Sequence, residues 1–158
     1  MSAEITDLQI VVFSLIDQYF GVDISLVSEI IRLEKITPTP NAPAYVEGII
    51  NIRGQIAPAV NLHVLFNTQA DERTENNRVI VVETEENKFG LIVDSVSEVR
   101  KISPDMIKPV PPSISVDEHY LKGIILDDKN LIVLVDLHQL LPNQDMQHLK
   151  QMEQLSET

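Results

Sequence analysis

The sequence contains two copies of one pattern, and this duplication limits the fold more than any other feature. Residues 20–30 (FGVDISLVSEI) reappear as residues 89–99 (FGLIVDSVSEV), with 5 of 11 positions identical. Residues 48–66 reappear without gaps as residues 123–141, with 7 of 19 positions identical. A repeat of this length is too long for the unit of a solenoid and too short for an ordinary independent domain. We therefore expect two small β units that share one core, with a seam between them where a partner can bind.

The composition fits a soluble globular chain with an aliphatic core. The chain has 158 residues, 44% of them hydrophobic, with four Phe, three Tyr and no Trp. Its formal charge is −12, from 24 acidic and 12 basic residues. Binding to phosphate backbones depends on clusters of Lys and Arg, so this balance argues against nucleic acids and anionic membranes as partners. A basic or apolar protein surface fits the chain better.

Several classes of protein are excluded by what the chain lacks. There is no Cys, so disulfides, thiolate catalysis and cysteine metal sites are ruled out. The first residues, MSAEITD, are acidic and lack the basic region of a signal peptide. No apolar run approaches the length of about 18 residues that a membrane span requires. These features predict a cytoplasmic protein without insertion into the membrane.

Short apolar runs separated by turn signals predict about ten strands, arranged as barrels or a sandwich. The strands are expected at residues 8–16, 19–24, 27–32, 49–53 and 56–61 in the first copy and at 79–84, 88–93, 96–101, 121–126 and 131–135 in the second. The proline-rich segments 36–43 and 104–112 are expected to be extended connectors. We expect a tail at 1–7, one domain at 8–141 with subdomains 8–76 and 77–141, and a C-terminal helix with a frayed end at 142–158.

The sequence has no arrangement of residues typical of a catalytic, cofactor or metal site. The glycines form no phosphate-binding or nucleotide-binding motif, and the histidines lack metal-ligand spacing. His63 and His138 occupy equivalent repeat positions, which allows a symmetric metal pair but favours two structural histidines. The acidic pairs at 85–86 and 127–128 fall at expected hairpin tips, and residues 117–119 (DEH) lack a nearby nucleophile. We expect no catalytic residue, no metal and no cofactor, and hence no enzyme.

Arg53 is the stronger candidate for a functional residue. It lies at the end of an expected strand beside Gly54, a position that often displays a side chain for recognition. Its repeat equivalent is Asp128, so the positive charge belongs to one copy only. The alternative is a solvated turn arginine, paired with Glu29 or Glu47 and contributing little stability.

Four apolar residues near the repeated Val-Ser-Glu blocks allow two interpretations. They either pack in the core or line a shallow groove between the copies that accepts an amphipathic helix. The residues are Ile24, Val27, Ile30 and Val96.

Residues 43–62 (PAYVEGIINIRGQIAPAVNL) resemble the signature of the chemotaxis coupling proteins, the CheW family. Residues 20–30 are similar to the preceding block, residues 89–96 to the family's Gly-apolar-Val-Asp run, and residues 120–123 to its closing block. The resemblance covers residues 8–141. Two positions depart from the pattern. Asn61 stands where many members have Asp, which should only soften a local turn contact, and Ser95 stands where Gly is frequent, so the local backbone there is expected to differ.

The resemblance implies a mainly β fold of two pseudo-symmetric, five-stranded SH3-like barrels packed side by side, with short helices and a C-terminal helix. It also implies a non-enzymatic adaptor that is located at receptor arrays in the cytoplasm. Such an adaptor couples the helical hairpin tip of a chemoreceptor (methyl-accepting chemotaxis protein) to the regulatory domain of a CheA-type histidine kinase. Carried over position by position, the receptor-binding residues are Val11, Ile24, Val27, Ile30 and Val96. The residues of receptor and kinase coupling are Glu29, Gly48, Asn51, Arg53 and Gly54.

The sequence is compatible with two other functions. One is a coupling scaffold of a related chemosensory pathway, such as surface motility or biofilm control. The other is a β-barrel that binds a small ligand or acts on it.

Overall fold

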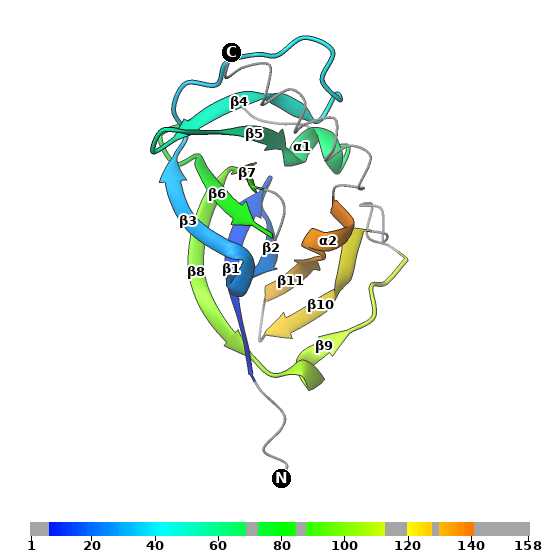
Figure 1. Ribbon diagram of the computed structural model, residues 1–158. Coiled ribbons are helices and arrows are strands. Elements are labelled where there is room, and N and C mark those ends of the chain that lie inside the picture. The colour runs from blue at the N-terminus through cyan, green and yellow to red at the C-terminus, as the bar shows by residue number, and fades with distance from the viewer. Residues whose placement is uncertain (1–6, 69–72, 85–87, 113–119, 128–129, 141–158) are drawn as a thin grey trace.

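The computed structural model describes residues 7–68, 73–84, 88–112, 120–127 and 130–140 (Figure 1). Within these ranges the fold is mainly β, with two sheets and only short helices, as the sequence predicts. The C-terminal helix expected at 142–158 and nearly all of the expected tail at 1–7 lie outside the described residues.

The first sheet has six strands in the order β8-β1-β2-β11-β10-β9. Its strands are β1 (Leu8–Leu15), β2 (Gln18–Asp23), β8 (Ser95–Ile102), β9 (Ile107–Lys108), β10 (Leu121–Asp127) and β11 (Asn130–Val135). All neighbouring pairs are antiparallel except β2 and β11, which run parallel. The two-residue strand β9 lies inside the segment 104–112, which we expected to be an extended connector. It is a short edge strand next to Pro109, the kind of position that proline tolerates.

The second sheet has five strands in the order β3-β6-β7-β5-β4. Its strands are β3 (Val27–Arg32), β4 (Val46–Ile52), β5 (Gln55–Asn61), β6 (Arg78–Glu83) and β7 (Lys88–Val93). The pair β5 and β7 is parallel, like β11 and β2 in the first sheet. Two short helices, α1 (Leu62–Leu65) and α2 (Leu137–Leu140), follow the equivalent strands β5 and β11.

Each sheet combines strands from both copies of the repeat. The order β3-β6-β7-β5-β4 matches β8-β1-β2-β11-β10 when strands are paired by their position in the repeat. The first copy supplies β1 and β2 to one sheet and β3, β4 and β5 to the other. The division that we expected at residues 76 and 77 therefore separates the two copies of the sequence, whereas the sheets exchange strands across it.

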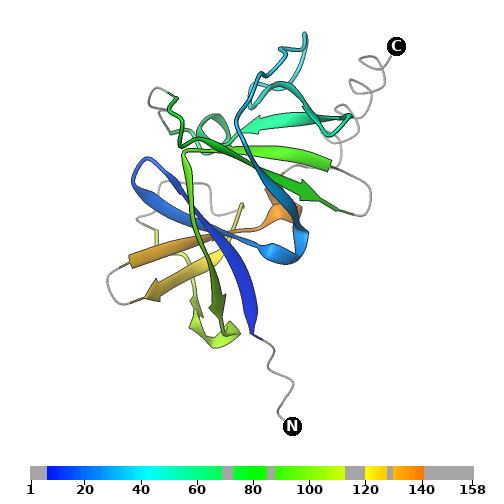
Figure 2. The same ribbon diagram turned by 90° about the vertical axis from the view of Figure 1, so that its left-hand side faces the viewer.

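The chain crosses between the sheets at the two repeated Val-Ser-Glu blocks. Strand β3 rises into the five-stranded sheet and β8 descends into the six-stranded sheet (Figures 1 and 2). Each block contains a β-bulge: Ser28 is the extra residue between Val27 and Glu29, and Ser97 is the extra residue opposite the step from Val12 to Phe13. A bulge bends a strand and increases its twist. The repeated motif thus marks the bend by which each strand enters its new sheet.

The buried apolar residues form three clusters, one inside each barrel and one between the sheets. The fully buried residues described in the two barrel interiors are Ile, Val, Leu and Ala. The cluster between the sheets draws on both of them and holds all four phenylalanines. Phe20 stacks on Phe13 and on Phe66, with ring centroids 5.8 and 5.5 Å apart. The expected aliphatic core is therefore found within the barrels, while the aromatic side chains join them.

Gly48 and its repeat equivalent Gly123 let the connectors pass close to the sheets. The backbone of Thr37 exchanges two hydrogen bonds with that of Ile49, of 2.9 and 2.8 Å. A Cβ atom on Gly48 would lie 2.2 Å from the carbonyl oxygen of Thr37, and one on Gly123 would lie 2.6 Å from that of Lys108. Glycine is required because no side chain fits under either connector.

We predict that Gly48→Ala lowers the free energy of unfolding by about 2 kcal/mol or more, because the connector backbone must move away from the added methyl group. Gly54→Asn is the matched control: a Cβ there meets nothing within 4 Å, and Asn tolerates the left-handed φ of 87° at this position. Urea unfolding measures both variants. Equal losses of stability in the two would contradict this role for Gly48.

Candidate functional site

The candidate receptor surface lies where β3 and β8 leave the crossings between the sheets. Ile24 is in the one-turn 3-10 helix Ile24–Leu26, Val27 is the first residue of β3, and Val96 is the second of β8. All three side chains are half-buried and pack against the cluster between the sheets. Ile30, further along β3, is 39% exposed, and its repeat equivalent Val99 on β8 is 51% exposed. Large apolar side chains thus reach solvent on both crossing strands.

Val11 does not belong to this surface. Its side chain is 1% exposed and lies in the cluster between the sheets. Val11 pairs with Val22 on one side and Val99 on the other, so β1 is covered by neighbouring strands at this point. The expectation that Val11 contacts a receptor directly is wrong, because β1 is an inner strand of the six-stranded sheet: one face packs in the cluster between the sheets and the other inside the barrel.

Asn51, Arg53 and Gly54 come together in the hairpin between β4 and β5. Arg53 and Gly54 adopt left-handed conformations, with φ of 52° and 87°, as two-residue hairpin turns of the primed type require. The side-chain oxygen of Asn51 accepts a hydrogen bond of 2.8 Å from the backbone N–H of Gly54. Asn51 therefore shapes the turn, and the turn presents Arg53.

The Arg53 side chain is 83% exposed, and its Nε lies 3.2 Å from Oε1 of Glu29. Glu29 is on β3 and Arg53 directly follows β4, so this ion pair links the two edges of the five-stranded sheet. Of the two ion-pair partners that we considered for Arg53, Glu29 and Glu47, the structure shows Glu29. An ion pair this exposed contributes little stability. The fold therefore depends little on this ion pair.

Asn61 gains a contact that an aspartate could not make. Its side-chain oxygen caps α1 by accepting hydrogen bonds from the N–H groups of His63 and Val64, at 3.0 and 3.4 Å. Its Nδ2 donates to Oε1 of Glu47 at 3.2 Å, and Glu47 also forms an ion pair with Arg73. A carboxylate would retain the cap but would repel Glu47. Asn61, in place of the Asp found in many family members, therefore adds an attractive contact with Glu47 to the capped turn.

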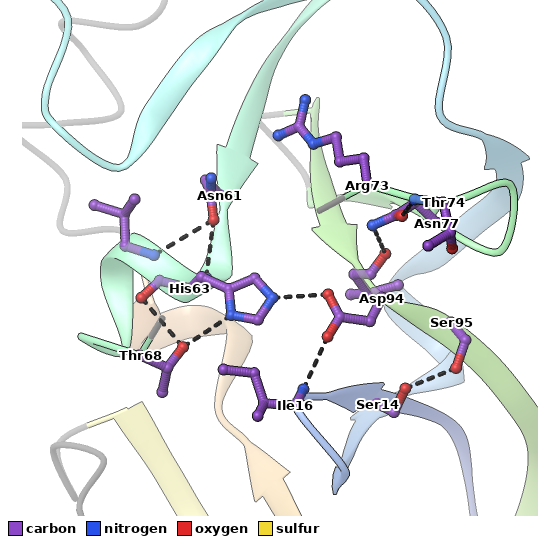
Figure 3. A network of polar contacts seen from close by, with 12 residues as sticks. Ser14, Ile16, Asn61, His63, Thr68, Arg73, Thr74, Asn77, Asp94 and Ser95 are labelled. Carbon is purple, nitrogen blue, oxygen red and sulfur yellow. Dashed lines mark hydrogen bonds and ion pairs between the residues drawn. The ribbon is translucent and has the colours of Figure 1, made fainter. Parts of the chain in front are cut away.

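The two equivalent histidines have different surroundings. His63 is 5% exposed, and its Nε2 lies 2.7 Å from Oδ1 of Asp94 while its Nδ1 lies 3.0 Å from the hydroxyl oxygen of Thr68 (Figure 3). His138 is exposed. Among the residues that the structure describes, no group of three or more His, Asp or Glu side chains is placed to hold a metal ion. Of the two equivalent histidines, His63 is buried and hydrogen-bonded, whereas His138 is exposed.

Asp94 connects the two sheets, a role that sequence reasoning did not assign. Its Oδ2 accepts a 2.8 Å hydrogen bond from the backbone N–H of Ile16, and its own N–H donates to the carbonyl of Ser14 at 3.1 Å. The hydroxyls of Ser14 and Ser95 lie 2.6 Å apart (Figure 3). Ser95, the second departure from the family pattern, thus adds a contact between β1 and β8. The sequence does show an Asp directly after a buried strand, which could have indicated such a role. Its hydrogen-bond partners could not be predicted, because they are distant in the sequence.

Comparison with known proteins identifies the fold and the role. Residues 9–145 match the family model of the CheW-like domain. The chain belongs to the CheW family. The chemotaxis protein CheW of Rhizobium meliloti is 33% identical over 138 residues, covering 87% of this chain and 89% of that protein. CheW of Klebsiella aerogenes is 31% identical over 147 residues, covering 92% of this chain and 89% of that protein.

A solved structure agrees with this assignment. The crystal structure of the scaffolding protein TtCheW from Thermoanaerobacter tengcongensis matches with a TM-score of 0.80 and 37% identity, covering 89% of this chain and 91% of that one. The expected pair of SH3-like barrels is thereby confirmed, and the chain is a coupling adaptor of chemotaxis. Among the described residues, no helix has the length and apolar character that crossing a membrane requires.

We predict that Arg53→Ala changes the free energy of unfolding by less than about 1 kcal/mol, because the ion pair with Glu29 is exposed. Asn61→Ala is the comparison: it removes the cap of α1 and the partner of Glu47, and should cost about 1 kcal/mol or more. Urea unfolding of both variants measures the difference. A larger loss for Arg53→Ala than for Asn61→Ala would show that Arg53 is chiefly a structural residue.

Proposed function

We propose that this CheW-family protein binds the cytoplasmic helical tip of a chemoreceptor on the surface formed by Ile24, Val27, Ile30 and Val96. The observation that carries the proposal is the exposure of Ile30 beside half-buried apolar residues at the junction of the two sheets. An amphipathic helix lays its apolar face into such a surface through residues spaced three and four apart. Exposed apolar residues on an edge strand are a liability unless a partner covers them.

We also propose that the hairpin of Asn51, Arg53 and Gly54, together with Glu29, contributes to coupling with a CheA-type histidine kinase. Arg53 is supported by its exposure and by the weak pairing with Glu29. Gly48 acts on this site indirectly, because the lack of a side chain sets the path of the connector over β4. Asn51 and Gly54 act by setting the conformation of the turn.

Such an adaptor performs no covalent chemistry and changes the kinase only by binding its conformational states unequally. Protein–protein interfaces that bury a standard area or less give moderate affinity. Repetition of the contacts in a receptor array, at the cytoplasmic side of the membrane, then multiplies the affinity through avidity. The same geometry serves a related chemosensory pathway equally well, and the receptor that is bound distinguishes the two.

We predict that Ile30→Asp abolishes binding to receptor tips while the protein stays folded. The side chain is already partly in solvent, so the charge costs the fold little, but it would be buried without a partner under a bound helix. Val27→Asp is less informative, because Val27 packs against the core and its replacement would also destabilise the fold.

The matched control is Leu126→Asp, which places the same charge at a 67% exposed apolar residue near the far end of β10. Co-sedimentation with receptor-tip fragments should separate the two variants. If Ile30→Asp still binds like the unaltered protein, the proposed receptor surface is wrong.

We predict that Arg53→Glu uncouples the kinase from the receptor without unfolding the protein. Reversal of the charge repels an acidic partner group and also Glu29, so the hairpin contact should weaken about tenfold or more. Lys122→Glu, an exposed lysine on β10 in the other sheet, is the matched control. Kinase activity in reconstituted receptor complexes measures the effect. Unchanged activation by Arg53→Glu would remove Arg53 from the coupling site.

A further inference from the structure

The polar network at the crossing from β7 to β8 has a role beyond holding the fold. We propose that Asp94 is a positioning residue that fixes the start of β8 and thereby presents Val96 to the receptor. This inference rests on the proposed receptor surface. In this proposal Asp94 does not touch the receptor. It acts through β8, the strand that directly follows it.

The geometry places Asp94 where several elements meet. It lies between the last residue of β7, in the five-stranded sheet, and the first residue of β8, in the six-stranded sheet. Its carboxylate accepts one hydrogen bond from Ile16, in the turn between β1 and β2, and one from the ring of His63 on α1. Its backbone N–H donates to Ser14 on β1. Val96 is two residues away, so its position depends on where these bonds hold the chain.

The bond to Ile16 also holds a turn that the sequence does not favour. Ile16 and Asp17 have φ of 46° and 59°, the left-handed region that a two-residue hairpin needs. Gly and Asn normally occupy such positions, and a β-branched residue with positive φ is strained. The Asp94 carboxylate, 2.8 Å from the N–H of Ile16, stabilises this conformation. Without it, the turn and the adjoining end of β1 should relax, and β8 pairs with that end.

His63 holds the carboxylate from the opposite side. Because an ionised carboxylate only accepts hydrogen bonds, the Nε2 atom of His63 must carry the proton that it shares with Asp94. Nδ1 faces the hydroxyl of Thr68, which can also donate to the carbonyl of His63 at 3.3 Å. The ring is buried, so it cannot replace a lost partner with water. At the other crossing, Asp23 caps the local turn by accepting from Ser25, so the two crossings are built differently.

Two substitutions of Asp94 separate positioning from simple stabilisation. Asp94→Ala removes the acceptor of both Ile16 and His63 and should release the start of β8. Asp94→Asn can retain both contacts if its amide oxygen accepts from Ile16 and its amide nitrogen donates to His63. The ring must then become the other tautomer, with its proton on Nδ1 facing Thr68. This tautomer change is a signature that a residue without contact to the ring would not produce.

The experiment compares the whole protein with Asp94→Ala, Asp94→Asn and Ile125→Val, a truncation inside the six-stranded barrel that serves as the stability control. Three measurements are made where all variants are folded: amide hydrogen exchange, imidazole ¹⁵N chemical shifts of His63, and affinity for a receptor-tip fragment. For Asp94→Ala we expect faster exchange at residues 95–99 and 15–17 and affinity weaker by about tenfold. For Asp94→Asn we expect the tautomer change with affinity within about twofold of the unaltered protein. Ile125→Val should leave affinity unchanged.

The outcomes distinguish this inference from the function on which it rests. Two results would overturn the positioning role. One is amide exchange at residues 95–99 that Asp94→Ala leaves unchanged. The other is an equal loss of receptor affinity in Asp94→Ala and Ile125→Val. If the unaltered protein fails to bind the receptor tip while the exchange and tautomer changes occur as expected, the receptor surface is wrong but Asp94 still positions β8.

Discussion

The apolar cluster between the two sheets is the contact on which the rest of the molecule depends. Among the described residues it holds 20 buried side chains, against 7 and 6 in the two barrel interiors, so most of this core lies between the barrels. Because a unit of this size is only marginally stable by itself, each barrel gains stability from packing against the other. The exchange of strands strengthens this dependence, since neither sheet can be completed from one copy of the repeat. Phe20 and its ring contacts with Phe13 and Phe66 lie within this shared cluster.

The candidate functional surface is a consequence of the same exchange. A strand that leaves one sheet and joins the edge of another must bend, and the bulges at Ser28 and Ser97 provide the bend. The crossing strands then lie at sheet edges, where one face packs against the shared cluster and the other reaches solvent. Val27 and Val96 are therefore half-buried, while Ile30 further along is exposed. A surface of this kind suits a helical partner, whose apolar stripe can cover both crossing strands.

The polar contacts of the molecule fall into two classes with different uses. Those at the crossing, around Asp94 and His63, are short and link segments more than 30 residues apart; the contact of His63 is partly buried, and that of Ile16 is exposed. The contact of the buried His63 ring helps to define the path of the chain, because water cannot replace its partner. The pair of Arg53 and Glu29 lies at the surface, with the arginine exposed and the glutamate partly buried, and links the two edge strands of the five-stranded sheet. Such a pair adds little to stability and can exchange partners, which suits a contact with another protein.

The sequence by itself determined the duplication, nearly all of the strands, the hairpin that presents Arg53 and the apolar character of residues 24, 27, 30 and 96. These properties are local, because they depend on the spacing of apolar residues and on turn residues. It did not determine which strands share a sheet, that Val11 is fully buried, or that His63 and His138 differ. Those properties depend on partners far away in the chain: Val11 is covered by strands of both copies, and His63 is held by Asp94 whereas His138 faces solvent. Two nearly identical local patterns acquire different roles because the shared core brings different residues to each, and only the tertiary structure decides which.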